Sequence, residues 1–375
     1  MNLGGSDKAV RQRYGIARWR IDSFFERFIA KKADSSKLWK KTYVYYYRLF
    51  DKEYFKNGMP HLRKACECFL GISEPDSALI EDMVYSLHRF GCTFEEYFLF
   101  GYQDLNAEGR ARFLTDKLRY EVYYLANEDS ARNLLNDKFE TYRIFGSYFC
   151  RDVVEVREDG DYDKLLEFVS KHDEFIAKPI KGQCGKGVTI YREVSQDCVV
   201  RLLHEFLDIG GVLVEGLIDQ SDEMAAFHQE SVNTVRMPVF RTKDGCIVVS
   251  PFFRMGRGKA IVDNGAQGGI IAGIDSGTGI VCTAGYDEMG GQFLYHPDSG
   301  RIIAGYKIPR WDEALDLVGK LSGVVEGLRY IAWDLALTDH GWVVVEGNAQ
   351  GQFLGQYATR YGIREQVDEI LDQLG

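Results

Sequence analysis

The pattern of hydrophobic and polar positions changes its period near residue 150. Before that point, apolar residues recur at helical spacing, as over residues 18–32, and a helix over residues 76–90 is expected to end at Gly91. After it, short apolar runs alternate with turn residues, which is typical of strands. The pattern therefore predicts a mainly helical N-terminal region followed by a mixture of strands and helices.

The second part of the chain supplies most of the predicted strands. Helices are expected at residues 164–171 and 198–207, and strands at residues 153–156, 211–218, 235–241 and 246–254. The turn TKDG joins the last two into an antiparallel pair. The following stretch, residues 254–275, is rich in glycine and is expected to form a long functional loop, with a solvated loop as the alternative.

A glycine-rich turn between two apolar runs, at residues 174–192, predicts a β-hairpin that could close over a nucleotide. Lys178 ends the first run, and glycines at 182, 185 and 187 let backbone N–H groups approach phosphate oxygens. Gly187 stands where a Walker A loop needs Ser or Thr, and a Rossmann fingerprint would continue into a helix. An ordinary hairpin with a glycine tip is the alternative.

Two apolar runs near the C-terminus, separated by a tight turn at residues 338–341, carry oxygen ligands. Asp334 lies in the first run, and Glu346 and Asn348 lie on one face of the second. Such hard oxygen donors suit Mg²⁺ bound to nucleotide phosphates. The alternative is that these carboxylates pair with arginines.

Two further positions are candidates on weaker grounds. Glu215, in the strand VLVEGLI, could accept from an adenine amino group, although most strand-end carboxylates face water. Lys138 lies in the first turn of a helix that Asn136 or Asp137 would cap, and such a lysine is usually solvated.

Composition sets the class of protein. A chain of 375 residues with 45% hydrophobic content can bury a large core in two or three domains. No apolar run approaches the ~18 residues of a membrane span, and the N-terminus lacks the apolar region of a secretory signal. We therefore expect a cytoplasmic protein that is not an integral membrane protein.

Charge and cysteine content exclude other classes. A net charge of −10 argues against a general nucleic-acid binder. The eight cysteines show no zinc-like spacing, and no histidine forms a motif with Cys184, so reduced core thiols are expected. The aromatic and basic residues of segment 18–32 fit a membrane-surface helix or, equally, a helix docked on its own domain.

The ordered set of motifs resembles the ATP-grasp superfamily, over about residues 130–365. The runs SVNTVRMPVF, FFRMGRGKAIVDNGAQGGI, IPRWDEALDL, WDLALT and VVEGN look most like the branch called sugar-transfer-associated ATP-grasp proteins. The resemblance implies an α+β ATP-grasp fold, in which two subdomains clamp ATP behind a largely helical N-terminal region. The expected divisions are residues 1–130 (helical), 131–172 (preceding segment), 173–218 (small subdomain) and 219–375 (large subdomain).

The resemblance also implies roles for individual residues. Lys138 and Lys178 match the nucleotide-binding lysines of the family, and the backbone around Leu217 and Ile218 would hold adenine together with Glu215. Two Mg²⁺ ions would be held by the three oxygen ligands, which are Asp334, Glu346 and Asn348.

The chemistry usual in this family is ATP-dependent activation of a carboxylate as an acylphosphate, which an amine, thiol or hydroxyl then captures. Arg254 is the candidate for stabilising the phosphoryl group, and Arg236 for anchoring the acid substrate. Both substrates would be small molecules. A small-molecule or sugar kinase and a non-catalytic ATP-binding accessory protein are the alternatives, and the sequence leaves the oligomeric state open.

Overall fold

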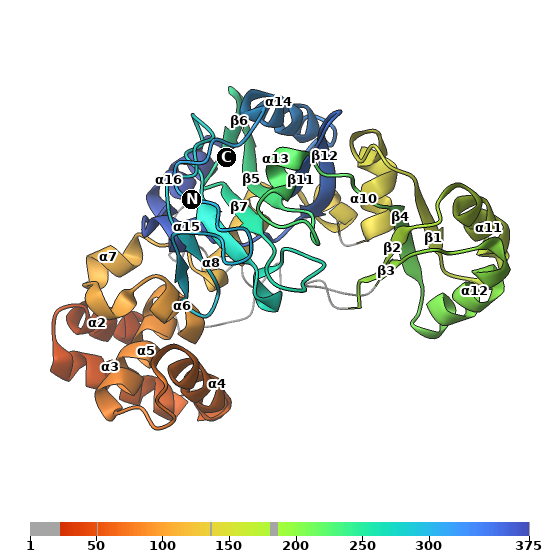
Figure 1. Cartoon of the computed structure of the whole chain (residues 1–375). Helices are drawn as coiled ribbons and strands as arrows, with labels where there is room; N and C mark the ends of the chain where they lie inside the picture. The colour runs from red at the N-terminus through yellow and green to blue at the C-terminus, as the bar shows by residue number, and fades with distance from the viewer. Residues whose placement is uncertain (1–22, 51, 136, 181–186, 375) are drawn as a thin grey trace.

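The structure is a computed structural model that describes residues 23–50, 52–135, 137–180 and 187–374. Figure 1 shows a helical region at the lower left, a large sheet in the centre and a small sheet with two helices at the right. Within the described residues, no helix is long and apolar enough to cross a bilayer.

The helical region comes first in the chain. The helices that precede the first strand are α2 (Phe24–Ala33), α3 (Lys37–Phe50), α4 (Lys52–Leu70), α5 (Ser77–Phe90), α6 (Phe94–Leu99), α7 (Ala107–Ala111), α8 (Asp116–Ala126), α9 (Asp129–Arg132) and α10 (Lys138–Phe145). The expected helix ending at Gly91 is confirmed as α5. Asp76 caps it by accepting from the Leu79 N–H at 2.8 Å, and Gly91 ends it in a left-handed conformation with φ 72°.

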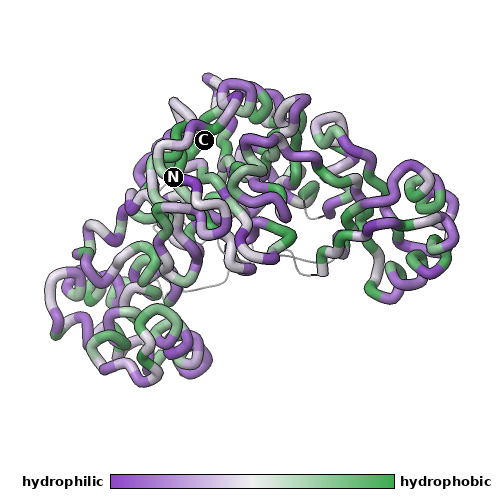
Figure 2. The backbone as a smooth tube through the Cα atoms, in the orientation of Figure 1, coloured by the Kyte–Doolittle hydropathy of each residue, from purple (hydrophilic) through white to green (hydrophobic). Residues whose placement is uncertain are grey.

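The core of the helical region continues into the large sheet. Buried aromatic side chains from α3, α5 and α6 pack in one cluster with Phe252, Ile271 and Tyr357, which belong to the C-terminal half of the chain. Figure 2 shows green and purple alternating along these helices, as expected for amphipathic helices with one buried side. The helical region is therefore packed against the sheet through an apolar contact.

The small sheet has the strand order β1-β4-β2-β3, with every neighbouring pair antiparallel. Its strands and the two helices that pack on them are β1 (Val153–Val156), α11 (Tyr162–Lys171), β2 (Phe175–Pro179), β3 (Thr189–Tyr191), α12 (Val199–Asp208) and β4 (Val212–Gly216). The predicted hairpin is confirmed by the β2–β3 pairing, in which Phe175 lies opposite Tyr191. Strand β1 comes from the segment before residue 173, and the proposed domain boundaries stay predictions.

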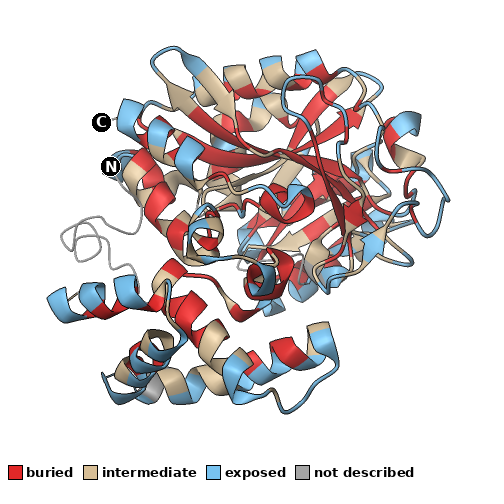
Figure 3. Cartoon of the chain, turned by 90° about the vertical axis from the view of Figure 1, so that its left-hand side faces the viewer, coloured by how far each residue is buried: buried red, intermediate tan, exposed pale blue. Residues whose placement is uncertain are grey.

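The large sheet has eight strands in the order β10-β9-β8-β7-β5-β11-β12, with β6 also paired to β5. The elements of this part are α13 (Asp222–Ala225), β5 (Thr234–Thr242), β6 (Gly245–Val248), β7 (Phe252–Met255), β8 (Ile270–Gly273), β9 (Gly285–Tyr286), β10 (Gln292–Phe293), α14 (Trp311–Ser322), β11 (Tyr330–Thr338), β12 (Gly341–Asn348), α15 (Gly355–Thr359) and α16 (Arg364–Leu374). Figure 3 shows buried residues, in red, along most of its central strands.

Three predictions of element bounds were wrong in detail. The expected single strand over residues 246–254 is divided into β6 and β7, because Ser250 takes a left-handed conformation with φ 50° and turns the chain. The loop expected over residues 254–275 ends early, since β8 pairs with β7 from Ile270 onward. Strand β4 also ends at Gly216, two residues before the predicted end.

Candidate functional site

The candidate site lies on one face of the large sheet. Alternation along β5, β7 and β11 directs Val235, Phe253 and Leu335 into the apolar core on the opposite face. Their neighbours in sequence form a polar row, in which Arg254 pairs across strands with Thr234, and Asp334 with Arg236. The sheet thus places both candidate arginines beside the candidate acid.

Ion pairs join the polar row. Arg236 Nη2 donates to Asp334 Oδ2 at 2.7 Å, and its Nε donates to the other carboxylate oxygen. Arg254 Nη1 donates to the same Oδ2 at 2.8 Å, while its Nη2 lies 3.0 Å from Asp263 Oδ1. Asp263, from the glycine-rich loop, also accepts from the Thr234 backbone N–H at 3.1 Å.

Burial and charge act in opposite directions on these groups. Burial opposes ionisation of Asp334, but Arg236 and Arg254 outweigh it and hold its pKa below the ordinary value. Burial raises the pKa of Asp263, and the nearby Arg254 offsets this only in part. Burial likewise opposes the charge on Arg254, whose pKa is nevertheless raised by Asp263 and Asp334. The two carboxylates therefore favour the charged form of the Arg254 guanidinium.

The predicted juxtaposition of Asp334, Glu346 and Asn348 is confirmed. Asp334 lies opposite Glu346 on β12, and Asn348 Nδ2 donates to Asp334 Oδ2 at 3.3 Å. The strand register shifts after Asp334, so that Leu335 pairs with Val344. Val345, between Val344 and Glu346, therefore has no partner on β11. This β-bulge turns Glu346 onto the polar face, whereas regular alternation would have placed it on the buried face with Val344.

The predicted magnesium site has two available oxygen donors, from Glu346 and Asn348. Within the described ranges, no group of three or more His, Cys, Asp and Glu side chains could hold a metal ion. Asp334 is engaged by two arginines, as the alternative from the sequence anticipated. Among described residues, the Glu346 carboxylate has no hydrogen bond or ion pair. One free carboxylate and the Asn348 amide oxygen fit Mg²⁺, which takes its remaining ligands from phosphates and water. The magnesium site stays a prediction.

Arg151 connects this row to the small sheet. Its Nε and Nη2 donate to Glu215 Oε2 at 2.9 and 2.5 Å, and the second oxygen of Glu215 lies 2.8 Å from Lys178 Nζ. The same guanidinium donates to the carbonyls of Val344 at 2.7 Å and Val345 at 3.2 Å. Because these carbonyls belong to the bulge, Arg151 brings Lys178 and Glu215 next to the segment that carries Glu346.

Glu215 is a buried anion between two cations. Burial raises its pKa, but Lys178 and Arg151 together outweigh burial and lower the pKa to about 2. The structure thus gives Glu215 two basic partners in the chain, and its contact with adenine stays a prediction. Leu217 and Ile218 follow β4 directly, in the segment that leads from the small sheet to the large one.

The glycine loop is described only at its end. Gly182 and Gly185 lie outside the described residues. Gly187 has φ 75°, and a Cβ there would lie 2.9 Å from Cγ of Pro179. A side chain at this position would therefore be strained by the backbone conformation and by the proline.

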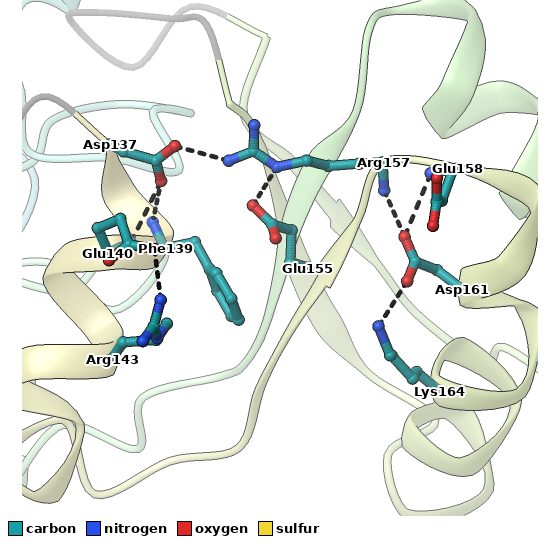
Figure 4. Close-up of polar contacts among 9 residues, drawn as sticks. All are labelled: Asp137, Phe139, Glu140, Arg143, Glu155, Arg157, Glu158, Asp161 and Lys164. Atoms are coloured by element: carbon teal, nitrogen blue, oxygen red, sulfur yellow. Dashed lines mark hydrogen bonds and ion pairs between the residues drawn. The ribbon is translucent and has the colours of Figure 1, made fainter.

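Lys138 begins α10, which lies between the two sheets (Figure 1). Asp137, predicted as one of two possible caps, accepts from the Phe139 N–H at 2.8 Å, and its other oxygen lies 2.7 Å from Arg157 Nη2. Figure 4 shows Arg157 reaching from the end of β1 to this cap. At the opposite end of α10, the Phe145 ring packs on Trp333, with centroids 4.9 Å apart. Contacts to both sheets thus fix the position of Lys138.

Sequence reasoning missed two residues of the site, Arg151 and Glu288. Arg151 precedes β1 in no recognisable motif, so its contacts depend on how the sheets meet. Glu288 follows β9, and its Oε1 packs so closely on Gly265 that a Cβ there would lie 2.1 Å away. Burial raises the pKa of Glu288, and Arg254 offsets this only in part. Within the described part of the chain this carboxyl has no hydrogen bond or ion pair.

Comparisons with known proteins agree with the motifs. The sequence model of a family described as sugar-transfer associated ATP-grasp matches residues 117–371. No curated protein matches the sequence. Similar solved structures include the ATP-grasp ligase PsnB with precursor peptide PsnA2 and AMPPNP (15% identity, TM-score 0.38, 66% of this chain and 60% of that one). Another is D-alanine-D-alanine ligase from Helicobacter pylori (14%, TM-score 0.42, 69% and 68%).

A third is N5-carboxyaminoimidazole synthetase from Staphylococcus aureus with ADP, at 14% identity and TM-score 0.38, over 60% of this chain and 48% of that one. The chain thus spans less than two thirds of the PsnB ligase and of this synthetase. At these identities and TM-scores, the family assignment rests on the sequence match, which covers more than half of the chain.

Proposed function

Because the chain belongs to the sugar-transfer-associated ATP-grasp family, we propose that it is a Mg-ATP-dependent carboxylate ligase that releases ADP. The observation that carries the proposal is the bridge made by Arg151, which joins the Lys178–Glu215 pair of one sheet to the Glu346 segment of the other. Phosphate-binding cations and metal-binding oxygens are both needed for phosphoryl transfer, and this bridge supports placing them in one site.

ATP would bind where the two sheets meet. Lys138, Lys178 and the glycine loop would contact phosphate oxygens, and the backbone after β4 would contact adenine. The Lys178 ammonium has three donors, so it can hold a phosphate oxygen while it stays paired with Glu215. Glu346, Asn348 and, through its remaining lone pairs, Asp334 would hold Mg²⁺, which when bound neutralises charge on the β- and γ-phosphates.

The arginines suit the first chemical step. An oxygen of the substrate carboxylate attacks the γ-phosphorus, the bond to the β–γ bridging oxygen breaks, and ADP leaves with the electron pair. Asp334 engages Nη1 of Arg254 and Asp263 engages Nη2, which fixes the guanidinium in place. Its remaining N–H groups can donate to the phosphoryl oxygens. Arg236, held at two atoms by Asp334, would anchor the acid through its remaining N–H groups.

Glu288 suits the second step. An amine or thiol attacks the acyl carbon, the carbon–oxygen bond to phosphate breaks, and inorganic phosphate leaves. The nucleophile must then lose a proton, and a carboxylate whose pKa is raised by burial is a stronger base than an exposed one. We propose Glu288 as the group that accepts this proton.

The substrate class is proposed from the family description alone. We infer an acid from polysaccharide or cell-envelope precursor metabolism, joined to an amino or thiol compound. Consumption of ATP supports a cytoplasmic location for the reaction.

The test is incubation with Mg-ATP, pooled carboxylic acids and hydroxylamine, with ADP, phosphate, AMP and hydroxamate measured together. We expect ADP and hydroxamate in equal amounts with the correct pool. ADP with neither phosphate nor hydroxamate would indicate a kinase, and AMP would contradict the proposed phosphoryl transfer.

A matched pair of variants tests the site in the same assay. Glu346→Gln should lose Mg-dependent turnover while thermal unfolding is unchanged, because the Glu346 carboxylate has no hydrogen bond or ion pair among the described residues. Glu326→Gln makes the same charge change at an exposed position of the large subdomain and should keep full activity. Equal activity of the two variants would remove Glu346 from the site.

A further inference from the structure

The helical region exposes an apolar surface far from the candidate site. This surface, called here the α2–α3 outer face, consists of Phe24, Phe25 and Phe28 of α2 and Leu38, Tyr45, Leu49 and Phe50 of α3. Phe24 and Leu38 are 81% and 72% exposed, values normal for polar surface residues. Contiguous exposed apolar side chains of this kind mark interaction sites on globular proteins.

Helix α3 is apolar on two opposite sides. Tyr43, Val44 and Tyr47 are buried in the core of the helical region. Leu38, Tyr45 and Leu49, spaced by seven and four residues, lie along the other side of the helix, and all three are exposed. Among the described residues, Leu38, Tyr45 and Leu49 do not belong to this core.

Ring contacts join the two helices into one surface. Phe25 of α2 meets Tyr46 of α3 with centroids 5.7 Å apart, and Tyr46 meets Phe50 at 4.6 Å. Phe28 meets Trp39 at 5.9 Å, one turn further along α2. These contacts link the exposed rings of Phe25, Phe28 and Phe50 across the two helices.

The two helices that carry this surface are rich in cations. Residues 24–50 contain seven Lys and Arg but two acids, in a chain whose net charge is −10. Glu26 is buried, and Asp34 pairs with Arg89 of another helix at 3.0 Å. The exposed cations on these two helices are Arg27, Lys31, Lys32, Lys37, Lys41 and Arg48.

We propose that the α2–α3 outer face binds the surface of an anionic lipid bilayer. Aromatic and leucine side chains would enter the headgroup boundary, while lysines extend toward lipid phosphates. Most of the exposed cations are lysines, which are depleted in protein–protein interfaces, so charge complementarity favours lipid over a protein partner. Figure 1 places α2 and α3 at the opposite end of the molecule from the small sheet, so docking would leave that sheet in solution.

The test is sedimentation of the full chain with phosphatidylcholine vesicles, with and without one quarter phosphatidylglycerol. We expect binding to the anionic vesicles, weak binding to the neutral ones, and release by 0.5 M salt. Lys31→Gln with Lys32→Gln should weaken binding at least tenfold, since one cation near such a surface contributes about fivefold. Lys243→Gln with Lys320→Gln, at exposed positions on the large subdomain, should not weaken it.

Apolar variants complete the test. Leu38→Gln with Leu49→Gln should also lose at least tenfold, whereas Leu294→Gln with Ile302→Gln, equally exposed elsewhere, should bind normally. Unchanged thermal unfolding would exclude misfolding as the cause. The proposal would be overturned by equal binding to neutral and anionic vesicles, or by equal losses in the control variants. It would also be overturned if no vesicles bind and the protein instead forms a dimer that Leu38→Gln with Leu49→Gln dissociates.

Discussion

Replacing Arg151 with methionine should destabilise the junction between the two sheets. The arginine side chain is 5% exposed and that of Glu215 is 3% exposed, so the variant leaves a buried carboxylate with Lys178 as its remaining cation. It also removes the donors to the carbonyls of Val344 and Val345. Methionine keeps much of the volume of the arginine stem, which limits the loss of packing.

The magnitude of the loss follows from the buried ion pair. Removing one partner of a buried ion pair costs about 3–5 kcal/mol of stability. Because Lys178 still pairs with Glu215 in the variant, we expect a loss near the lower value. The pKa of Glu215 falls from 4.5 to about 2 in the folded protein. At about 1.4 kcal/mol per pKa unit this corresponds to about 3 kcal/mol of stability, which Lys178 and Arg151 supply together. Because the folded pKa is depressed, this stabilisation is complete above pH 4.5 and is lost as the pH falls toward 2.

The assay is urea unfolding followed by far-ultraviolet circular dichroism, at pH 7 and at pH 4. Arg151→Met should lose about 3 kcal/mol at pH 7, and the double variant with Glu215→Gln should lose less than the sum of the single losses. The matched control is Arg192→Met, whose exposed partner Glu174 lies at 3.1 Å, with an expected cost of about 0–1 kcal/mol. If Arg151→Met cost no more than Arg192→Met, the bridge would not hold the sheets together.

Three further predictions concern single residues. Gly187→Ala should lower the free energy of unfolding by about 1–2 kcal/mol, because φ is 75° and the new Cβ meets Pro179, and it should also weaken ATP binding measured by calorimetry. Burial lowers the pKa of His296, whose Nε2 lies 2.7 Å from the Gly256 carbonyl, so stability should be greatest above pH 6.5 and should fall as the pH drops below it. His296→Gln should remove that dependence in urea titrations at pH 7.5 and 5.5. Glu288→Gln should slow turnover about 100-fold and abolish the acid limb of the pH–rate profile. We expect this limb above pH 4.5, because burial raises the pKa of the Glu288 carboxyl.

Local pattern was sufficient for much of the fold. Strand β1 was predicted with its observed ends, and the hairpins β2–β3 and β11–β12 follow from apolar runs around turn residues. Helix α5 follows from its cap at Asp76 and its end at Gly91. These features depend on residues close together in the chain, which is why the sequence alone could predict them.

Features that depend on distant contacts were not predictable in the same way. Ser250 has no sequence signal for the left-handed conformation that separates β6 from β7. The bulge that turns Glu346 onto the polar face is a matter of register between strands, and the contacts of Arg151 depend on how the two sheets meet. The sequence placed Arg236 and Asp334 as separate candidates, whereas their pairing follows from the β5–β11 register.

The most direct test of the ligase proposal is oxygen transfer from the acid substrate to phosphate. Once hydroxylamine trapping has identified the acid, its carboxylate is labelled with ¹⁸O and turned over with Mg-ATP and the nucleophile. Attack of the carboxylate on the γ-phosphorus predicts one ¹⁸O atom in each inorganic phosphate released. Unlabelled phosphate, or label in AMP instead, would contradict an acylphosphate intermediate and with it the proposed function.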